Sequence, residues 1–334
     1  MPVRKTESRL PFDFLASDLG QAVLSSDNKI ACISFVSSPL VVGRENIYVV
    51  FVTDTTLASS VERFEWGISE NSGAASTEMT DFGEFAYTPL STGELSVTVR
   101  LLGSGDSELA SVSINQNIVA LHDEIETLIN DAADSVEPGI GNPDVARELV
   151  NDHSPYYQDI LMQAPESDES FQRFVYSMTY DGALRKTPTQ RKEHVTQIKN
   201  SLNTQDLDFQ TVAGEGAGIC GIRLALLAMV IPQSPGGSTM LLNWTEIPEA
   251  PNQRLIESEQ LLESLSNLEE EKRLDLFNLV RFPKSNISQC ARIIETLRDH
   301  YFSGVSFNDV MTGLSGTRAH WIVRHYREGP LRRE

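Results

Sequence analysis

The stretch Gly214-Glu-Gly-Ala-Gly-Ile-Cys-Gly-Ile-Arg-Leu-Ala-Leu-Leu-Ala-Met-Val-Ile231 holds the most apolar run of the chain behind its most glycine-rich segment. A helix that spans a bilayer needs about 20 apolar residues. The run 217–231 is shorter and contains Arg223, so we expect no membrane insertion. We expect instead a helix over residues 217–231, buried at the centre of a C-terminal domain and entered through a flexible glycine loop.

The same stretch contains the one cysteine that a helix start could activate. Cys220 opens the apolar run, and the N-terminal dipole of a helix lowers the pKa of a nearby thiol. A cysteine nucleophile also needs a histidine base, and His320 and His325 follow in residues 317–327. One hypothesis is therefore a cysteine-dependent hydrolase that uses Cys220 with His320 or His325. Against it, no Asn or Asp follows His320, and a cysteine among Ile and Leu is more often a small buried apolar residue.

Gly216, Gly218 and Gly221 have the spacing G-x-G-x-x-G, which binds pyrophosphate where a strand turns into a helix. Residues 207–213 are a candidate strand in front of it, and Glu246 lies at about the distance of a ribose-binding acid. Yet the chain has no repeated βαβ pattern and no phosphate-binding loop with a lysine. We expect the glycines to permit close packing, and a degenerate nucleotide-binding unit over residues 206–246 stays an open alternative.

A net charge of −20 limits the partners that the chain attracts. The acidic excess is greatest in residues 111–180, whereas residues 281–334 are net basic. Such a surface repels phosphate backbones, so we expect no nucleic-acid partner. None of the 6 histidines forms an H-x-x-x-H pair or lies near a cysteine at zinc-ligand spacing, so we expect neither a metal site nor a cofactor.

Cys32, Cys220 and Cys290 are odd in number and far apart, which predicts no disulfide framework. The first ten residues contain no hydrophobic segment of the kind that starts a secretory signal. We therefore expect a cytoplasmic location, with release by a non-classical route left open.

Short runs rich in β-branched and aromatic residues follow one another from residue 30, separated by Gly, Ser, Asp and Pro. In one of them Leu95, Val97, Val99 and Leu101 fall on one face and polar residues on the other, as in a half-buried strand. Such a series predicts an antiparallel β-sandwich. The predicted strands are 30–36, 46–52, 61–66, 83–87, 94–101 and 109–114.

Three of these runs resemble a known family. The segments Phe64-Glu-Trp-Gly67, Phe85-Ala-Tyr87 and Thr92-Gly-Glu-Leu-Ser-Val-Thr-Val99 are similar to the polycystic-kidney-disease type of immunoglobulin-like module. The resemblance covers residues 30–118. Leu95 stands where the family has an aromatic residue, and the family's Gly-Asp-Gly turn after the tryptophan is absent. The resemblance implies an immunoglobulin-like fold that serves as a spacer or binding surface and carries no chemistry of its own.

Around Asn115 the apolar period changes from 2 to 3.6, which predicts helices in the rest of the chain. The domains we expect are a lead-in over residues 1–28, the immunoglobulin-like sandwich over 29–118, an acidic helix and linker over 119–143, and a mainly helical domain over 144–334. Helices are predicted at about 168–180, 188–202, 217–231, 252–281, 286–302, 306–314 and 317–327, with short strands at 206–213 and 240–244.

The function that these observations favour is a non-enzymatic, multidomain interaction or scaffold protein that binds other protein chains. Its oligomeric state is left open. Immunoglobulin-like modules without a secretion signal resemble those of phage and contractile-tail-like particles, so a component or cargo of a phage-tail-like particle is the context we expect. The cysteine-dependent hydrolase is the alternative from another class.

Overall fold

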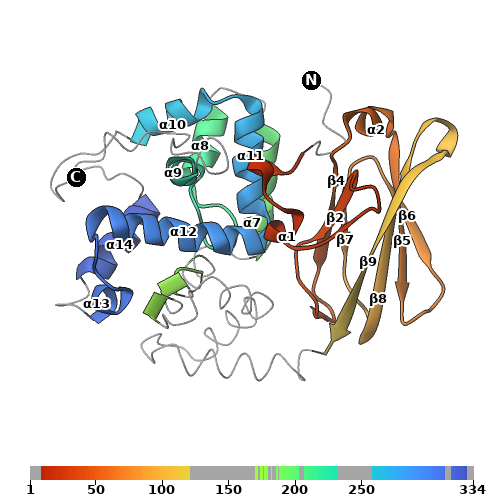
Figure 1. The fold of residues 1–334 in the computed structure, drawn as a ribbon, viewed down its shortest axis with the longest axis horizontal. Coiled ribbons are helices and arrows are strands. Elements are labelled where there is room, and N and C mark those ends of the chain that lie inside the picture. The colour runs from red at the N-terminus through yellow and green to blue at the C-terminus, as the bar shows by residue number, and fades with distance from the viewer. Residues whose placement is uncertain are drawn as a thin grey trace. The chain divides into compact units, whose positions relative to one another are not determined.

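A computed structural model describes residues 9–120, 170–171, 174–175, 177–179, 182, 186, 188–202, 207–231, 258–312 and 317–328. The chain divides near residue 138 into two compact units. Two β-sheets lie in the N-terminal unit and helices α7 to α14 in the C-terminal unit, as Figure 1 shows. The predicted division into a β part and a helical part is therefore confirmed. Nearly all of the predicted linker, 119–143, lies outside the described residues.

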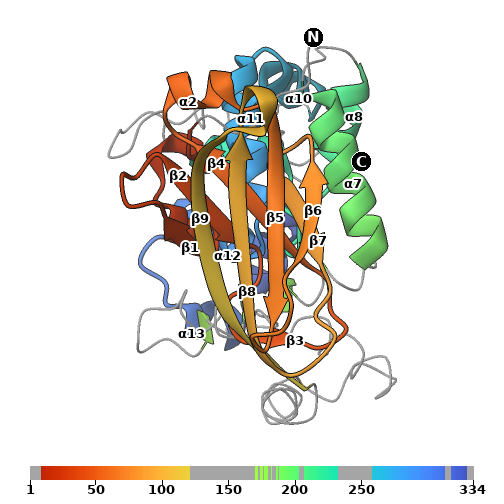
Figure 2. The same cartoon turned by 90° about the vertical axis from the view of Figure 1, so that its right-hand side faces the viewer.

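The N-terminal unit has a four-stranded and a five-stranded sheet, seen one behind the other in Figure 2. The four-stranded sheet has the order β1 (Gln21–Leu24), β2 (Ile30–Ser34), β4 (Asn46–Val52) and β7 (Glu84–Tyr87). The five-stranded sheet has the order β3 (Leu40–Val41), β9 (Glu108–Val119), β8 (Gly93–Leu102), β5 (Arg63–Glu70) and β6 (Ser76–Thr80). Neighbouring strands are antiparallel, except that β3 runs parallel to β9. The short helices of this unit are α1 (Ala16–Leu19), α2 (Thr55–Ser60) and the 3₁₀ turns Pro11–Asp13 and Ser104–Asp106.

Side chains from both sheets build one hydrophobic core. The predicted inward face of residues 95–101 is confirmed, because Leu95, Val97, Val99 and Leu101 are all buried. Trp66 of β5 stacks on Phe85 of β7, and their ring centroids lie 5.2 Å apart. Burying one large apolar side chain stabilises a fold by about 1.5–3 kcal/mol, so these facing residues hold the two layers together.

Between β2 and β3 the chain passes from the four-stranded to the five-stranded sheet, and we call residues 35–39 the crossing segment. Gln116 of β9 binds this segment. Its side-chain nitrogen donates to the Val36 carbonyl at 2.9 Å and to the Gln21 side-chain oxygen at 3.0 Å. Its side-chain oxygen accepts from the Tyr48 hydroxyl at 2.8 Å. The amide is buried and fully engaged, and it therefore joins β1, β4 and β9 to the crossing segment.

Asn46 of β4 binds the same crossing segment from the other side. Its side-chain oxygen accepts from the Val36 backbone N–H at 3.0 Å, and its amide nitrogen donates to the Ser34 hydroxyl at 2.7 Å. Gln21 completes the arrangement by accepting from the Ser38 backbone N–H at 2.8 Å. The crossing is thus fixed by side chains where neither sheet supplies ladder bonds.

Three strands were not predicted, and each lacks a local signal. β1 lies in the expected lead-in and is half-exposed, β3 has two residues, and β6 has the polar sequence Ser-Thr-Glu-Met-Thr. All three pair with strands that the pattern does predict. Tertiary pairing outweighs intrinsic strand preference in such segments.

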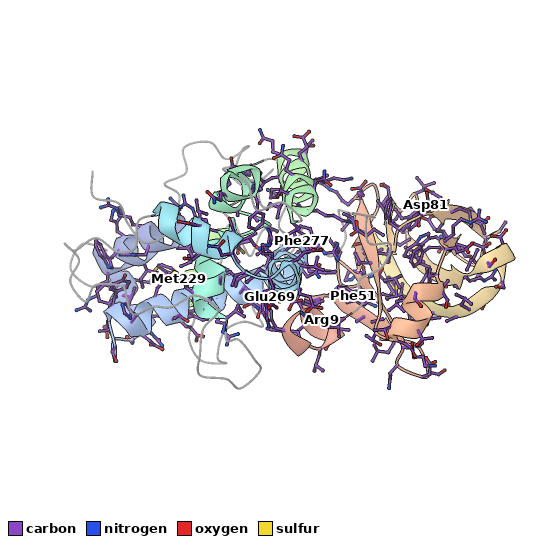
Figure 3. All side chains as sticks on the ribbon, turned by 90° about the horizontal axis from the view of Figure 1, so that it is seen from above. Arg9, Phe51, Asp81, Met229, Glu269 and Phe277 are labelled. Carbon is purple, nitrogen blue, oxygen red and sulfur yellow. The ribbon has the colours of Figure 1, made fainter. Side chains whose placement is uncertain are left out.

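The C-terminal unit is built of helices around α9 (Leu224–Val230), every residue of which is buried. Helix α9 contacts α8, α10, α11 and α12, and Figure 3 shows Met229 and Phe277 among these helices. The predicted central buried helix is confirmed, although it is shorter than expected. The other helices are α7 (Pro188–Ser201), α8 (Leu207–Gly214), α10 (Ser258–Ser266), α11 (Glu270–Arg281), α12 (Pro283–Tyr301), α13 (Phe307–Thr312) and α14 (Thr317–Glu328).

The predictions for residues 206–213 and 252–281 need correction. The expected helix 252–281 is two helices, α10 and α11, separated at residues 267–269. The expected strand 206–213 is wrong, because residues 207–214 form helix α8. Phe209 and Ala213, both fully buried, lie four residues apart on one helical face. The predicted strand 240–244 lies outside the described residues.

We expect Gln116→Leu to destabilise the N-terminal unit by about 2–4 kcal/mol, because it leaves the buried Tyr48 hydroxyl and Val36 carbonyl without these partners. Ser111→Ala is the matched control on the same strand, where an exposed hydroxyl is lost and the change stays within about 0.5 kcal/mol. Urea unfolding followed by circular dichroism measures both. Equal stabilities of the two variants would contradict the role given to Gln116.

Candidate functional site

The glycine-rich stretch forms a tight hairpin, residues 217–222, which we call the glycine loop. Ala217 and Ile222 exchange two backbone hydrogen bonds of 2.8 Å each. Gly218 and Gly221 have positive φ angles of 71° and 61°, a conformation that residues with a Cβ rarely adopt. The first half of the predicted helix 217–231 is therefore a hairpin, and the helix begins only at Leu224.

The glycines of this loop also allow close approach of other groups. A Cβ on Gly218 would lie 2.3 Å from the Asn286 amide nitrogen and 2.4 Å from the Val280 carbonyl oxygen. A Cβ on Gly216 would lie 2.4 Å from the Gly221 carbonyl oxygen. The G-x-G-x-x-G spacing thus has a steric explanation, as the packing interpretation predicted.

Asn286 of α12 binds the glycine loop and is fully buried. Its side-chain oxygen accepts from the Cys220 N–H at 2.8 Å. Its amide nitrogen donates to the carbonyl oxygens of Ala217 at 3.2 Å and Val280 at 3.0 Å. The Tyr326 hydroxyl donates to the Cys220 carbonyl at 3.0 Å. The bonds from Asn286 and Tyr326 to Cys220 satisfy its buried N–H and carbonyl, which have no partner within the loop.

This geometry does not support phosphate binding. The amides of Ala217, Cys220 and Ile222 already donate within the protein, whereas a phosphate site needs backbone N–H groups directed at the ligand. The segment in front of the loop is helix α8 and not a strand. The nucleotide-binding alternative for residues 206–246 therefore loses its structural premise, and Glu246 lies outside the described residues.

Cys220 is buried, and its sulfur lies 3.3 Å from the Thr179 hydroxyl. Burial, followed by the neighbouring thiol of Cys290, raises the pKa of Cys220 well above its usual value. The thiol therefore stays protonated, whereas a nucleophilic cysteine must be a thiolate. The helix start that was expected to lower this pKa comes only after the glycine loop.

The two candidate bases lie on α14. His320 is exposed. His325 is buried against Tyr301 and Trp321, with ring centroids 4.6 Å away in both cases. Within the described ranges, the side-chain partners of Cys220 are Thr179 and Cys290, with no imidazole among them. The hydrolase stays a prediction that this geometry does not favour.

A charged cluster lies next to the glycine loop. Lys186 donates to the Glu215 carboxylate at 2.9 Å and to the Gly216 carbonyl at 3.2 Å. His194 Nε2 lies 3.1 Å from the Val212 carbonyl and 3.5 Å from Glu215. Burial, and then the charge of Lys186, lowers the pKa of His194. The lowered pKa favours the neutral ring in the folded protein.

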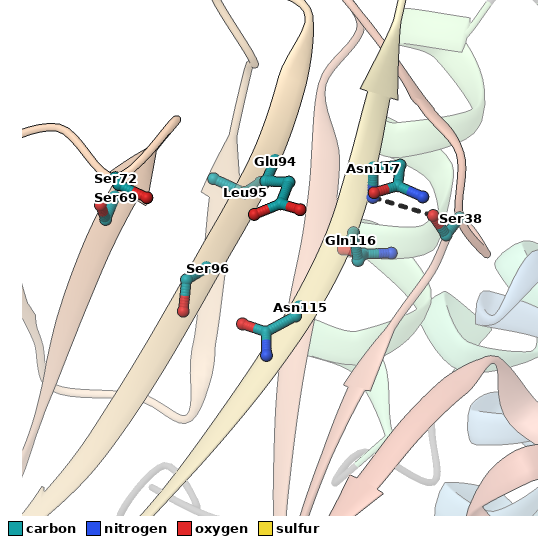
Figure 4. A pocket seen from close by; sticks show the side chains of 9 residues that line it. All are labelled: Ser38, Ser69, Ser72, Glu94, Leu95, Ser96, Asn115, Gln116 and Asn117. Carbon is teal, nitrogen blue, oxygen red and sulfur yellow. Dashed lines mark hydrogen bonds between the residues drawn. The ribbon is translucent and has the colours of Figure 1, made fainter.

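A depression of about 350 Å³ opens on the outer face of the five-stranded sheet. Figure 4 shows its lining, which comes from β5, β8, β9, the turn after β5 and the crossing segment. Apart from Leu95, the side chains carry hydroxyls, amides and one carboxylate, with no aromatic and no basic residue. They are those of Ser38, Ser69, Ser72, Glu94, Leu95, Ser96, Asn115, Gln116 and Asn117.

Most of the outward side chains in this depression have unused hydrogen-bonding capacity. In the part of the chain that the structure describes, the side chains of Glu94, Ser96, Asn115 and Asn117 form no hydrogen bond within the protein, although the backbones of Glu94, Asn115 and Asn117 do. Strand register places these four together, because Glu94 lies opposite Asn117 and Ser96 opposite Asn115. Polar groups that converge on a concave surface can fix the orientation of a ligand and give specificity.

The other end of the same face is internally paired. The Thr98 and Ser113 hydroxyls lie 2.7 Å apart in a hydrogen bond. Arg100 donates to Glu65 at 2.8 Å and lies 3.7 Å from Glu108. The contrast identifies the depression as the functional candidate on this face. Sequence reasoning did not find it, because the signal depends on the register between distant strands.

Two other kinds of site have no counterpart in the described ranges. They contain no group of three or more His, Cys, Asp or Glu side chains that could hold a metal ion. No described helix combines the length and the apolar character needed to cross a bilayer.

We expect Gly218→Ala to destabilise the C-terminal unit more than Gly304→Ala does. Gly304 has a similar φ of 77°, but a Cβ there meets no atom within 4 Å. Gly304→Ala therefore costs only the left-handed strain of about 1–2 kcal/mol, and Gly218→Ala adds about 1–3 kcal/mol for overpacking. Urea unfolding of the two variants measures the difference, and equal losses would contradict the packing role of Gly218.

The lowered pKa of His194 predicts a pH dependence of stability. The unfolded chain takes up a proton on this ring near pH 6.5, and the folded protein does so only at lower pH. Stability is therefore lost as the pH falls from about 6.5 through the folded pKa. His194→Gln should flatten this slope. Urea unfolding of the wild-type protein and the variant between pH 7.5 and 5.5 checks this, and an unchanged slope in His194→Gln would contradict it.

Comparisons with known proteins add no family to these observations. No protein-family model matches the chain, and searches of curated proteins and of solved structures find no match either.

Proposed function

We propose that this chain is a non-enzymatic interaction protein, whose N-terminal unit is an immunoglobulin-like sandwich that binds another protein chain. The single observation that carries the proposal is the depression on the five-stranded sheet, where polar side chains with unused hydrogen-bonding capacity surround a concave surface. Recognition between proteins uses such groups to fix orientation and specificity.

The strand order supports the immunoglobulin-like interpretation. In such folds the tryptophan strand of one sheet pairs with the next-to-last strand, and that strand pairs with the last one. Here β5 carries the buried Trp66 and pairs with β8, which pairs with β9, while β2, β4 and β7 follow one another in the other sheet. The resemblance to the polycystic-kidney-disease type of module is consistent with this order, with buried Leu95 in place of the family's aromatic residue.

The chemistry of the described residues supports a binding role over catalysis. The Cys220 thiol is buried and has a raised pKa. In the G-x-G-x-x-G segment, the backbone N–H groups of Ala217 and Cys220 already donate within the protein. The net charge of −20 disfavours nucleic acid. By analogy with immunoglobulin-like modules of phage and contractile-tail-like particles, the context we propose is a component or cargo of such a particle.

Site-specific photo-crosslinking tests the proposed surface in the cells that produce the protein. Asn115 and Ser111 are both exposed, lie on β9 and point to the same outer face, but only Asn115 lines the depression. With benzoylphenylalanine at Asn115 we expect a discrete adduct with another protein, and none with the probe at Ser111. No adduct at Asn115, or identical adducts at both positions, would refute the proposal.

A further inference from the structure

We propose that the depression accepts an arginine side chain of the partner protein. The inference rests on the proposed function and names the chemistry of its ligand. The four side chains that carry it are those of Glu94 and Ser96 on β8 and of Asn115 and Asn117 on β9.

Glu94 supplies the charge that selects a cation. Glu94 is exposed, is the one ionisable side chain in the lining of the depression, and forms no ion pair with another described residue. Arg100, the basic side chain farther along the same strand, is already engaged with Glu65 and Glu108. A cation that reaches the depression therefore finds a carboxylate without a competing partner.

The neighbours of Glu94 match the shape of a guanidinium group. Directly opposite residues on antiparallel strands have Cβ atoms about 4.5–5.5 Å apart, so Asn117 lies beside Glu94 and Asn115 beside Ser96. Carboxylate, amide and hydroxyl oxygens thus lie on two adjacent strands. A guanidinium is planar and has five N–H donors and no acceptor, so it can bind the carboxylate in a bidentate way and still donate to the amide and hydroxyl oxygens.

The depression favours an arginine over a sugar or a lysine. Sugar sites commonly offer an aromatic ring on which the ring of the ligand stacks, and the lining has none. Lysine presents a compact point charge and cannot use the whole row of acceptors. The volume of about 350 Å³ accommodates an arginine side chain with water, and the net charge of −20 attracts basic segments to the protein.

Peptide titration of the full chain, followed by backbone amide NMR, tests the inference directly. The probes are the capped pentapeptide Gly-Ser-Arg-Ser-Gly and its citrulline and lysine counterparts. Citrulline keeps the shape of arginine and removes the charge. We expect the arginine peptide to shift the amide signals of Ser96 and Asn115, with little response to citrulline and a weaker one to lysine.

Two carboxylate variants complete the experiment. Glu94→Gln should weaken the binding of the arginine peptide about fivefold, which corresponds to the upper end of what an exposed ion pair contributes. Glu78→Gln removes the same charge from exposed β6, outside the depression, and should leave binding unchanged. Equal loss in both variants would show general charge attraction and overturn the inference.

The outcomes separate this inference from the proposed function. If Asn115 crosslinks a partner but the arginine peptide causes no shift, the arginine inference fails and the binding surface stands. If N-acetylglucosamine shifts the same signals and the arginine peptide does not, the ligand is a sugar and the inference is wrong. Failure of both the crosslink and the titration removes the surface itself.

Discussion

The hydrogen bonds of Asn286 to the glycine loop are the interaction on which the C-terminal unit depends. A loop so tight cannot pair all of its own backbone groups, and water is excluded from this place. The side-chain amide of Asn286 accepts from the Cys220 N–H, which has no partner within the loop, and adds a second bond to the Ala217 carbonyl. Because α9 follows the loop directly, the same contacts set where the central helix begins and how α12 lies against it.

Local sequence predicts those parts of the fold whose signal is local. The strand 46–52 and the apolar stripe of α12, which includes Ile287 and Cys290, follow from spacing, and both are found. β3 and β6 could not be predicted, because their own residues carry no strand pattern. They are strands because they pair with β9 and β5, respectively. The sequence predicts a strand in place of helix α8, because Leu207, Phe209 and Ala213 fit a period of two. The burial of Phe209 and Ala213, four residues apart, fits the helical period as well.

The two candidate sites show the same division between local and distant information. The G-x-G-x-x-G spacing is visible in the sequence, yet its meaning depends on Asn286 and on α8, which no local pattern reveals. Conversely, Glu94 and Asn115 have no motif around them, since polar residues at every second position are ordinary for an exposed strand face. Only the register between β8 and β9 brings them together.

The outer strand β6 has a consequence for how this protein associates. Glu78 lies opposite Trp66 in the ladder, so its charged side chain is on the core side of the sheet at the exposed margin. A charge in that position opposes the addition of a further strand from another molecule, because that strand would bury it. The β6 edge of the five-stranded sheet is therefore protected against extension by a strand of another molecule, so that contacts on this side of the sheet are left to side chains.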